Sequence, residues 1–182
     1  DQMEKDKARS SEEETWDLVE LDLDYAIENL PESWPANEKG KINKYIALAF
    51  KSRAMLYAER WQSAYDASDA VVKSGKYELM ENYSDSWAGD NEESILEFNY
   101  DIIGPNHSFD KDYVPLSDGY EFGGLGTPTQ EMVESYEKTD GSKLNWAPYH
   151  SATAVRPPYE ELEPRFKATI IYPGSSWKGH IM

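Results

Sequence analysis

The chain of 182 residues has no cysteine, few basic residues and no long apolar run. The absence of cysteine excludes disulfides, thiolate zinc sites and a thiol nucleophile. Only 18 Lys and Arg stand against 35 Asp and Glu, which gives a net charge of −17. This deficit of cations argues against nucleic acid or an anionic membrane surface as a partner. No apolar stretch reaches the roughly 18 residues that a membrane-spanning helix needs, so we expect no such helix.

Aromatic residues are abundant in spite of the high charge. The chain is 39% hydrophobic and 29% charged, yet it contains 6 Trp, 13 Tyr and 5 Phe. Aromatic residues in this number favour a packed core, a binding surface or both over disorder. The length fits one domain or a large part of one. The chain starts at Asp1 with no signal-peptide pattern behind it, so we expect a piece of a longer protein.

The acidic first part of the chain carries the pattern of an amphipathic helix. Ser11 and Glu14 form a capping box before it, and Pro31 ends it. The acids are expected to form its solvated face. Its apolar positions recur every three or four residues, at Trp16, Val19, Leu23, Ile27 and Leu30.

Two further helices are expected to form an antiparallel hairpin. Apolar spacing predicts helices over residues 42–57 and 61–72, with a break at Glu59–Arg60 and a left-handed cap at Gly75. Alanines at the crossing with bulky aromatics around them are typical of tetratricopeptide-like hairpins, which cannot bury their apolar face alone. We therefore expect exposed apolar patches or oligomers where helical neighbours are missing.

The second half of the chain is expected to consist of long loops with few regular elements. Alternating patterns predict strands over residues 95–100 and 168–172. Thr127 as cap, with Pro128 and Gln130 behind it, predicts a helix that ends at Asp140–Gly141. The aromatic residues that fall on periodic or strand positions, and are therefore expected in the core, are Tyr57, Trp61, Tyr65, Phe98 and Phe166.

The predicted fold class is mainly α, with tetratricopeptide-like helical hairpins, long loops and a few short strands. We expect one domain, helical over residues 12–80 and loop-rich over residues 81–182.

Four segments in order along the chain resemble the SusD/RagB family. They are residues 39–83, Glu93–Tyr100, Pro128–Glu137 with Asp140–Gly141, and Glu163–Ile170 followed by Trp177–Gly179. The family usually shows Asp where Glu163 stands, a change that keeps the charge. The resemblance implies a SusD-like superhelix of paired helices within a longer protein that begins with a lipid-anchored cysteine.

The resemblance also implies a function. Members of the family are non-catalytic lipoproteins exposed on the outer membrane of Bacteroidetes, where they capture glycans. They act as a lid on a SusC-like, TonB-dependent outer-membrane transporter, to which they deliver oligosaccharides for nutrient uptake.

Residue patterns give little support for catalysis. His107, His150 and His180 lack metal-ligand spacing, no Gly-x-Ser-x-Gly elbow occurs, and no Lys-Ser/Thr follows the Gly-rich residues 123–126. A glycosidase would need two carboxylates that converge beside Trp146 or Tyr120. The candidate pairs are Asp110/Asp112, Asp118/Glu121 and Glu160/Glu161.

Binding of a sugar has better support, because sugar rings stack on aromatic faces and their hydroxyls bond polar side chains, often on loops. Two loop segments offer this combination. One holds Tyr113, Asp118, Tyr120 and Phe122, and the other holds Asn145, Trp146, Tyr149 and Arg156. Trp146 is the strongest single candidate, since it lies outside any periodic face. For each of these aromatics the alternative is a ring that anchors its loop to the scaffold.

Two other interpretations stay open. The acidic loop with Asp85, Asp90, Asn91, Glu92 and Glu93 offers oxygen ligands for calcium, although it lacks the order of an EF-hand and is otherwise a solvated loop. No other cofactor is expected. The alternative function is a helical-repeat module that binds protein or peptide, as an adaptor or in peptide import.

Overall fold

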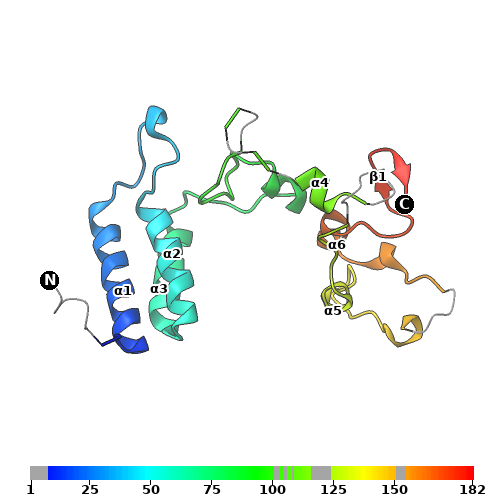
Figure 1. The fold of residues 1–182 in the computed structure, drawn as a ribbon, viewed down its shortest axis with the longest axis horizontal. Coiled ribbons are helices and arrows are strands. Elements are labelled where there is room, and N and C mark those ends of the chain that lie inside the picture. Colours follow the sequence, from blue (N-terminus) through cyan, green and yellow to red (C-terminus); the bar gives the residue numbers. More distant parts are fainter. Residues whose placement is uncertain (1–7, 101–102, 105, 108, 116–123, 151–154) are drawn as a thin grey trace. The chain divides into compact units, whose positions relative to one another are not determined.

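A computed structural model describes residues 8–100, 103–104, 106–107, 109–115, 124–150 and 155–182 (Figure 1). Candidate residues Asp118, Tyr120 and Phe122 lie outside this described part. The chain divides into two compact units. The first holds the residues up to Glu81 and Asp85–Phe98, and the second holds Asn82–Ser84 and the residues from Asn99 onward. The boundary that we expected near residue 80, between a helical and a loop-rich part, coincides with this division, except that residues 85–98 belong to the first unit. The single domain stays a prediction.

The first unit is built on three helices, α1 (Glu12–Asn29), α2 (Lys44–Tyr57) and α3 (Trp61–Lys73), with a 3-10 turn, η2, at Ala36–Glu38. The predicted capping box is confirmed, because Ser11 Oγ accepts from Glu14 N at 3.1 Å and Glu14 Oε2 accepts from Ser11 N at 2.8 Å. Helix α1 ends before Pro31, as expected. Asn43 caps the start of α2, because its Oδ1 accepts the backbone N–H groups of Tyr45 and Ile46.

The predicted hairpin of α2 and α3 is confirmed. The chain reverses over Ala58–Arg60, where Glu59 takes a φ of 58°, and the two helices then pack against each other. Gly75 has a φ of 62° just beyond α3, the left-handed conformation that glycine adopts at least cost. The sequence therefore placed both ends of α3 correctly to within two residues.

The core of the first unit forms where α2 is covered by its neighbours. Tyr45 and Leu48 from α2 pack with Ala67 and Val71 from α3, and Ile27, Tyr77 and Ile95 pack around them. The prediction that Tyr57, Trp61 and Tyr65 are core residues is wrong, because all three are exposed. The helical period was correct, but its phase was not. Ala64, Ala67 and Val71 are the buried residues of α3, whereas Trp61 and Tyr65 on the same helix are exposed.

The second unit contains only short elements. They are the helices α4 (Phe109–Tyr113), α5 (Gln130–Ser135) and α6 (Pro164–Thr169), the 3-10 turns η5 (Ala147–Tyr149) and η6 (Tyr159–Glu161), and the strands β1 (Ser176–Trp177) and β2 (His180–Ile181). A further 3-10 turn, η3, covers Tyr83–Trp87. The two strands pair antiparallel, with Trp177 opposite His180. The turn between them is Lys178–Gly179, with φ values of 45° and 83°, which suits a tight hairpin.

Several predicted elements of the second half are wrong. Residues 95–100 form no strand, and Phe98 is exposed. Residues 168–172 form no strand either, because Pro164 starts helix α6, which runs to Thr169. Thr129, not Thr127, caps α5, and α5 ends at Ser135 before Asp140–Gly141. Strand-forming residues need a partner strand, and the described residues offer none to these two segments. The core position of Phe166 is confirmed.

Exposed apolar side chains are numerous on the helices, as we expected for helices that lack neighbours. They include Leu18, Leu21 and Tyr25 on α1, Phe50, Leu56 and Tyr57 on α2, and Trp61, Tyr65 and Val72 on α3. Across the described residues, no helix combines the length and apolarity that crossing a membrane requires.

Met55 and Leu56 provide a matched test of the α2 packing, because Met55 is 0% exposed and Leu56 is 55% exposed. Met55→Ala is expected to lower the free energy of unfolding by about 2–5 kcal/mol, since it leaves a cavity in the core. Leu56→Ala is expected to change it by about 0.5 kcal/mol or less. Urea unfolding followed by circular dichroism measures both. Equal losses for the two variants would contradict this packing.

Candidate functional site

The second unit is held together by a group of aromatic side chains, which we call the aromatic cluster. Its buried residues are Trp146, Leu162 and Phe166, and its half-buried members are Val133, Tyr136, Leu144, Tyr149, Tyr159, Ile170 and Tyr172. The Tyr159 and Phe166 rings stack with centroids 5.7 Å apart, and Tyr172 lies 5.0 Å from Tyr159. Ring pairs at these distances add to the burial energy of their area.

Trp146 lies inside the aromatic cluster, and not on an open loop surface as we expected. Asn145 Oδ1 accepts from Ala147 N at 3.2 Å, and Trp146 O accepts from Tyr149 N at 2.8 Å, which forms the η5 turn. This turn directs the indole inward, where only 6% of Trp146 is exposed. The ring therefore offers no free face for a sugar to stack on, and the anchoring alternative describes its position. Its buried Nε1 has no hydrogen-bond partner among the described residues.

Tyr149 and Asn145 lie beside Trp146 but nearer to solvent. The Tyr149 ring is half-buried and meets the Trp146 ring edge to face, with centroids 6.3 Å apart. Asn145 is exposed, and its side-chain oxygen holds the turn. These two residues keep the access to solvent that a binding role needs.

Arg156 covers one side of the aromatic cluster. Its guanidinium carbon lies 5.7 Å from the Tyr159 ring centroid and 6.0 Å from that of Tyr172, within the range of a cation–π contact. Its Nη2 also donates to Glu160 Oε1 at 2.5 Å. Gly174, with a φ of 92°, passes so close that a Cβ there would meet Arg156 Nη2 at 2.7 Å. The guanidinium is therefore fixed by an acid, two rings and a glycine.

The structure brings together three members of one predicted segment, Trp146, Tyr149 and Arg156, on a single cluster. Of the other segment, Tyr113 is exposed, stacks on Phe109 with centroids 5.1 Å apart and lies over Gly126.

Two residues of this candidate site were missed from the sequence, Tyr159 and Tyr172. Tyr159 directly follows Pro157–Pro158. An aromatic residue after a rigid proline pair was the sequence signal that could have identified it as part of the site. Tyr172 was assigned to a strand that does not form.

The carboxylates beside the aromatic cluster lack the properties of a glycosidase pair. Glu160 bonds Arg156, whereas Glu161 bonds Lys138 at 2.8 Å. The pKa of the Glu160 carboxyl lies below its ordinary value, first because its own backbone N–H donates to it and then because Arg156 does. A general acid needs a raised pKa instead, so Glu160 is suited to hold Arg156 and not to donate a proton.

The acidic loop is held by protein contacts. Asp90 bonds Lys39, Asn91 Oδ1 accepts from the backbone N–H groups of Glu93 and Ser94, and Glu93 Oε2 accepts from Met80 N at 2.9 Å. Within the described part of the chain, no three acids or histidines gather in a way that could hold a metal ion. Calcium binding by this loop stays an untested alternative.

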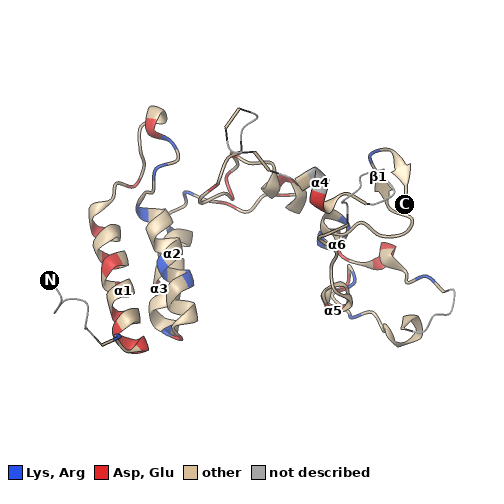
Figure 2. Ribbon diagram, viewed as in Figure 1, with Lys and Arg blue, Asp and Glu red and all other residues tan. Residues whose placement is uncertain are grey.

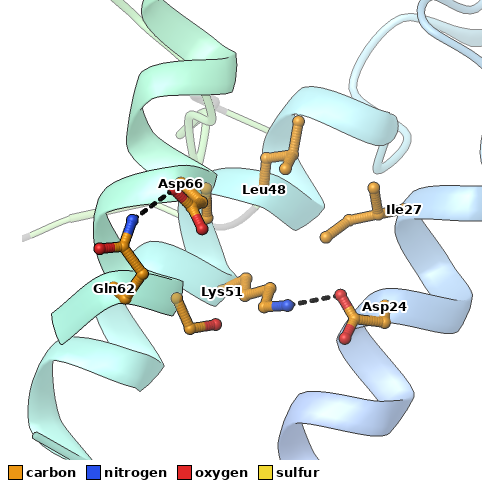
Figure 3. Close-up of a pocket in the computed structure, with 8 residues that line it drawn as sticks. Asp24, Ile27, Leu48, Lys51, Gln62 and Asp66 are labelled. Carbon is orange, nitrogen blue, oxygen red and sulfur yellow. Dashed lines mark hydrogen bonds and ion pairs between the residues drawn. The ribbon is translucent and has the colours of Figure 1, made fainter. Parts of the chain in front are cut away.

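A pocket of about 410 Å³ opens between α1, α2 and α3 (Figure 3). The pocket has both apolar and polar lining residues, which are Asp24, Ile27, Leu48, Lys51, Gln62, Ser63, Asp66 and Ala67. Lys51 Nζ lies 2.5 Å from Asp24 Oδ1 and 3.4 Å from Glu20 Oε1. Burial lowers the pKa of Lys51, but its bonds to these two acids outweigh burial and raise it. The lysine therefore serves to tie α2 to α1.

Glu20 is the centre of the polar contacts between the three helices. It accepts from Ser63 on α3 and from Arg60 Nη1 at 2.7 Å, in addition to Lys51. The pKa of Glu20 lies below its ordinary value, chiefly because of the Ser63 hydroxyl and then of Arg60. A carboxyl whose pKa is lowered by folding stabilises the folded state above its unfolded pKa and loses this effect as the pH falls.

Glu20→Gln is therefore expected to destabilise the protein at neutral pH. The difference in unfolding free energy between wild type and variant should shrink as the pH falls through and below the ordinary value of 4.5. Urea unfolding between neutral and acidic pH measures this difference. Glu78→Gln, in an exposed loop position, is the control and should track the wild type. A Glu20→Gln deficit that is the same at every pH would sink the assignment.

Comparisons with known proteins identify the family of this chain. The SusD family profile matches residues 61–181. A SusD-like protein of Bacteroides ovatus is 26% identical over 180 residues, which cover 90% of this chain and 29% of that protein. A SusD-like protein of Formosa agariphila is 25% identical over 95 residues, 52% of this chain and 17% of that protein.

Two solved structures from Bacteroides fragilis are similar as well. A SusD-like protein is 32% identical with a TM-score of 0.73, covering 92% of this chain and 36% of that one. A SusD-like carbohydrate-binding protein is 24% identical with a TM-score of 0.80, covering 94% of this chain and 34% of that one. The chain thus spans about a third or less of the length of these relatives. The family match over two thirds of the chain, together with the mainly helical fold, shows that the chain belongs to the SusD family.

Proposed function

We propose that this chain is part of a protein that binds glycans without catalysis and delivers them to a transporter. The observation that carries the proposal is its membership of the SusD family. The carbohydrate-binding relative from Bacteroides fragilis, which shares the fold, supports glycans as the class of ligand.

In the proposed site, the sugar meets the exposed rim of the aromatic cluster. Tyr149 offers a half-buried ring and its hydroxyl, Asn145 an amide, and Arg156 a guanidinium that two tyrosine rings orient. Sugar hydroxyls pair with such planar donors, and the apolar faces of the ring pack on aromatic carbon. The buried Trp146 ring supports the Tyr149 ring by packing against it. The segment with Tyr113, Asp118, Tyr120 and Phe122 is proposed as a second contact.

Capture without turnover fits the chemistry of the acids nearby. Glu160 and Glu161 are each bonded by a separate cation, and the lowered pKa of Glu160 opposes proton donation. The whole protein would be held at the outer-membrane surface of a Bacteroidetes bacterium by a lipid anchor and would pass oligosaccharides to a SusC-like, TonB-dependent transporter.

A second function, binding of protein or peptide, is favoured by a different observation. Trp61 and Tyr65 are exposed one turn apart on α3, and aromatic pairs on open helical faces are common anchors for peptides. Here the ligand would lie on the helical face of the first unit. Peptide import by a member of the same family is the other form of this alternative.

Calorimetric titration of the full-length protein against a panel of polysaccharides and peptides separates the two functions. A glycan that binds the wild type should bind Arg156→Ala about 10–100-fold more weakly, because a hydrogen bond to a charged group is lost. Arg53→Ala, at an exposed arginine on α2, is the matched control and should bind like wild type. Trp146→Ala is unsuitable alone, since removal of a buried ring lowers stability by about 3–5 kcal/mol.

Trp61→Ala tests the alternative in the same titrations. Peptide binding that Trp61→Ala abolishes, with no glycan bound, would replace the proposal by the peptide function. Glycan binding that Arg156→Ala leaves unchanged would keep the glycan function but remove the rim of the aromatic cluster as its site.

A further inference from the structure

Acids and bases occur in pairs on the elements that form the aromatic cluster, whereas helix α1 carries acids and no Lys or Arg (Figure 2). Four acids of these elements are each bonded by a basic side chain. The pairs are Glu134–His150, Glu161–Lys138, Glu160–Arg156 and Glu163–Arg165. The Glu160–Arg156 pair differs from the others in one respect, since its cation also lies against the Tyr159 and Tyr172 rings. This pair therefore belongs to the rim of the cluster.

The Glu160–Arg156 pair presents an acceptor and a donor next to each other. Arg156 Nη2 donates to Glu160 Oε1 at 2.5 Å. The Arg156 side chain is 44% exposed and that of Glu160 is 58% exposed, so a ligand can reach both. A guanidinium can only donate hydrogen bonds and a carboxylate can only accept them. Two neighbouring hydroxyls of a sugar match this pair, because one oxygen accepts from Arg156 while the other hydroxyl donates to Glu160.

The surroundings of Glu160 keep its side chain ionised. Its own backbone N–H and then Arg156 lower the pKa of the carboxyl, and the charge of Lys167 adds to this shift. Lys167 Nζ also donates to Glu160 O at 2.8 Å, so both nearby cations are directed at this one residue. A carboxylate or sulfate of a ligand that approached Arg156 would therefore lie beside the Glu160 carboxylate. Like charges placed side by side in this way oppose binding.

We infer that the ligand of this site is an uncharged sugar with neighbouring hydroxyls, and that Glu160 excludes sugars that bear a carboxylate or a sulfate. The inference rests on the proposed function and adds the chemical class of the glycan to it. Repulsion of the wrong ligand is a general way to obtain specificity. The net charge of −17 acts in the same direction at longer range.

Oligosaccharides that differ only in charge test the class of ligand. Fully methyl-esterified galacturonan is compared with its de-esterified form, and desulfated galactan with its sulfated form, by calorimetric titration of the full-length protein at low ionic strength. The uncharged member of a pair should bind more tightly. An acidic member that binds the wild type as tightly as its uncharged form, or more tightly, would overturn the inference.

Glu160→Gln and Glu161→Gln form a matched pair of variants that tests the role of Glu160. Each removes one charge from one of two adjacent residues with similar side-chain exposure, 58% and 52%, but only Glu160 bonds Arg156. Glu160→Gln should raise the affinity for the acidic member, relative to the uncharged one, by about 2–5-fold. Glu161→Gln should leave this ratio near that of the wild type. The gain should shrink at high salt, where charges are screened.

The outcomes separate this inference from the proposed function. Equal changes for the two variants would show a general effect of net charge and overturn the role of Glu160. Glycan binding that Arg156→Ala leaves unchanged would overturn the inference, because the site would lie elsewhere, while the glycan function stands. A full-length protein that binds neither these pairs nor any other glycan would overturn the proposed function and the inference together.

Discussion

The first unit depends on the burial of α2 between its two neighbours. Helix α2 supplies five buried residues, Tyr45, Ile46, Ala47, Leu48 and Met55, while α3 supplies three and α1 none. Ala64 and Ala67 let α3 approach α2 closely, and on the other side Lys51 and Arg60 bond the acids of α1. Helix α1 is thus held to the hairpin by half-buried apolar contacts and by charge. Paired charges at partly exposed positions contribute modestly, so the apolar contacts of α2 carry most of the stability.

The helices of the first unit were predictable from the sequence because their signals are local. A capping box at Ser11 and a glycine at position 75 act within one turn of the chain. The phase of burial was less predictable. Trp61 and Tyr65 repeat at helical spacing and are apolar, but the neighbouring alanines face α2. Only the close approach of two helices decides that small residues are inside and aromatic residues outside, and a single sequence does not record this distance.

The second unit was harder to predict from the sequence than the first. Two segments of strand-forming residues, 95–100, which straddles the two units in sequence, and 168–172, form no strand, because the described residues offer neither of them a partner strand. Trp146 was judged a surface residue because no periodic face contains it. Its burial is set by Leu162 and Phe166, which follow it by more than ten positions. Packing between irregular segments that are far apart in the chain leaves no periodic pattern in the sequence. The sequence therefore indicated which residue types form the candidate site, but not which way their side chains point.

This packing also constrains where a ligand can be held in the second unit. Helices α5 and α6 have six residues each, too short to be stable alone, so the aromatic cluster has to supply most of their stabilisation. A ligand that inserted between Trp146, Leu162 and Phe166 would separate the residues on which both helices depend. The proposed binding at the rim would avoid this conflict, because Tyr149 and Arg156 are already oriented by neighbouring rings and would lose little freedom on binding. In the proposed site, Trp146 is therefore a rigid support for Tyr149 and not the stacking surface that the sequence pattern suggested.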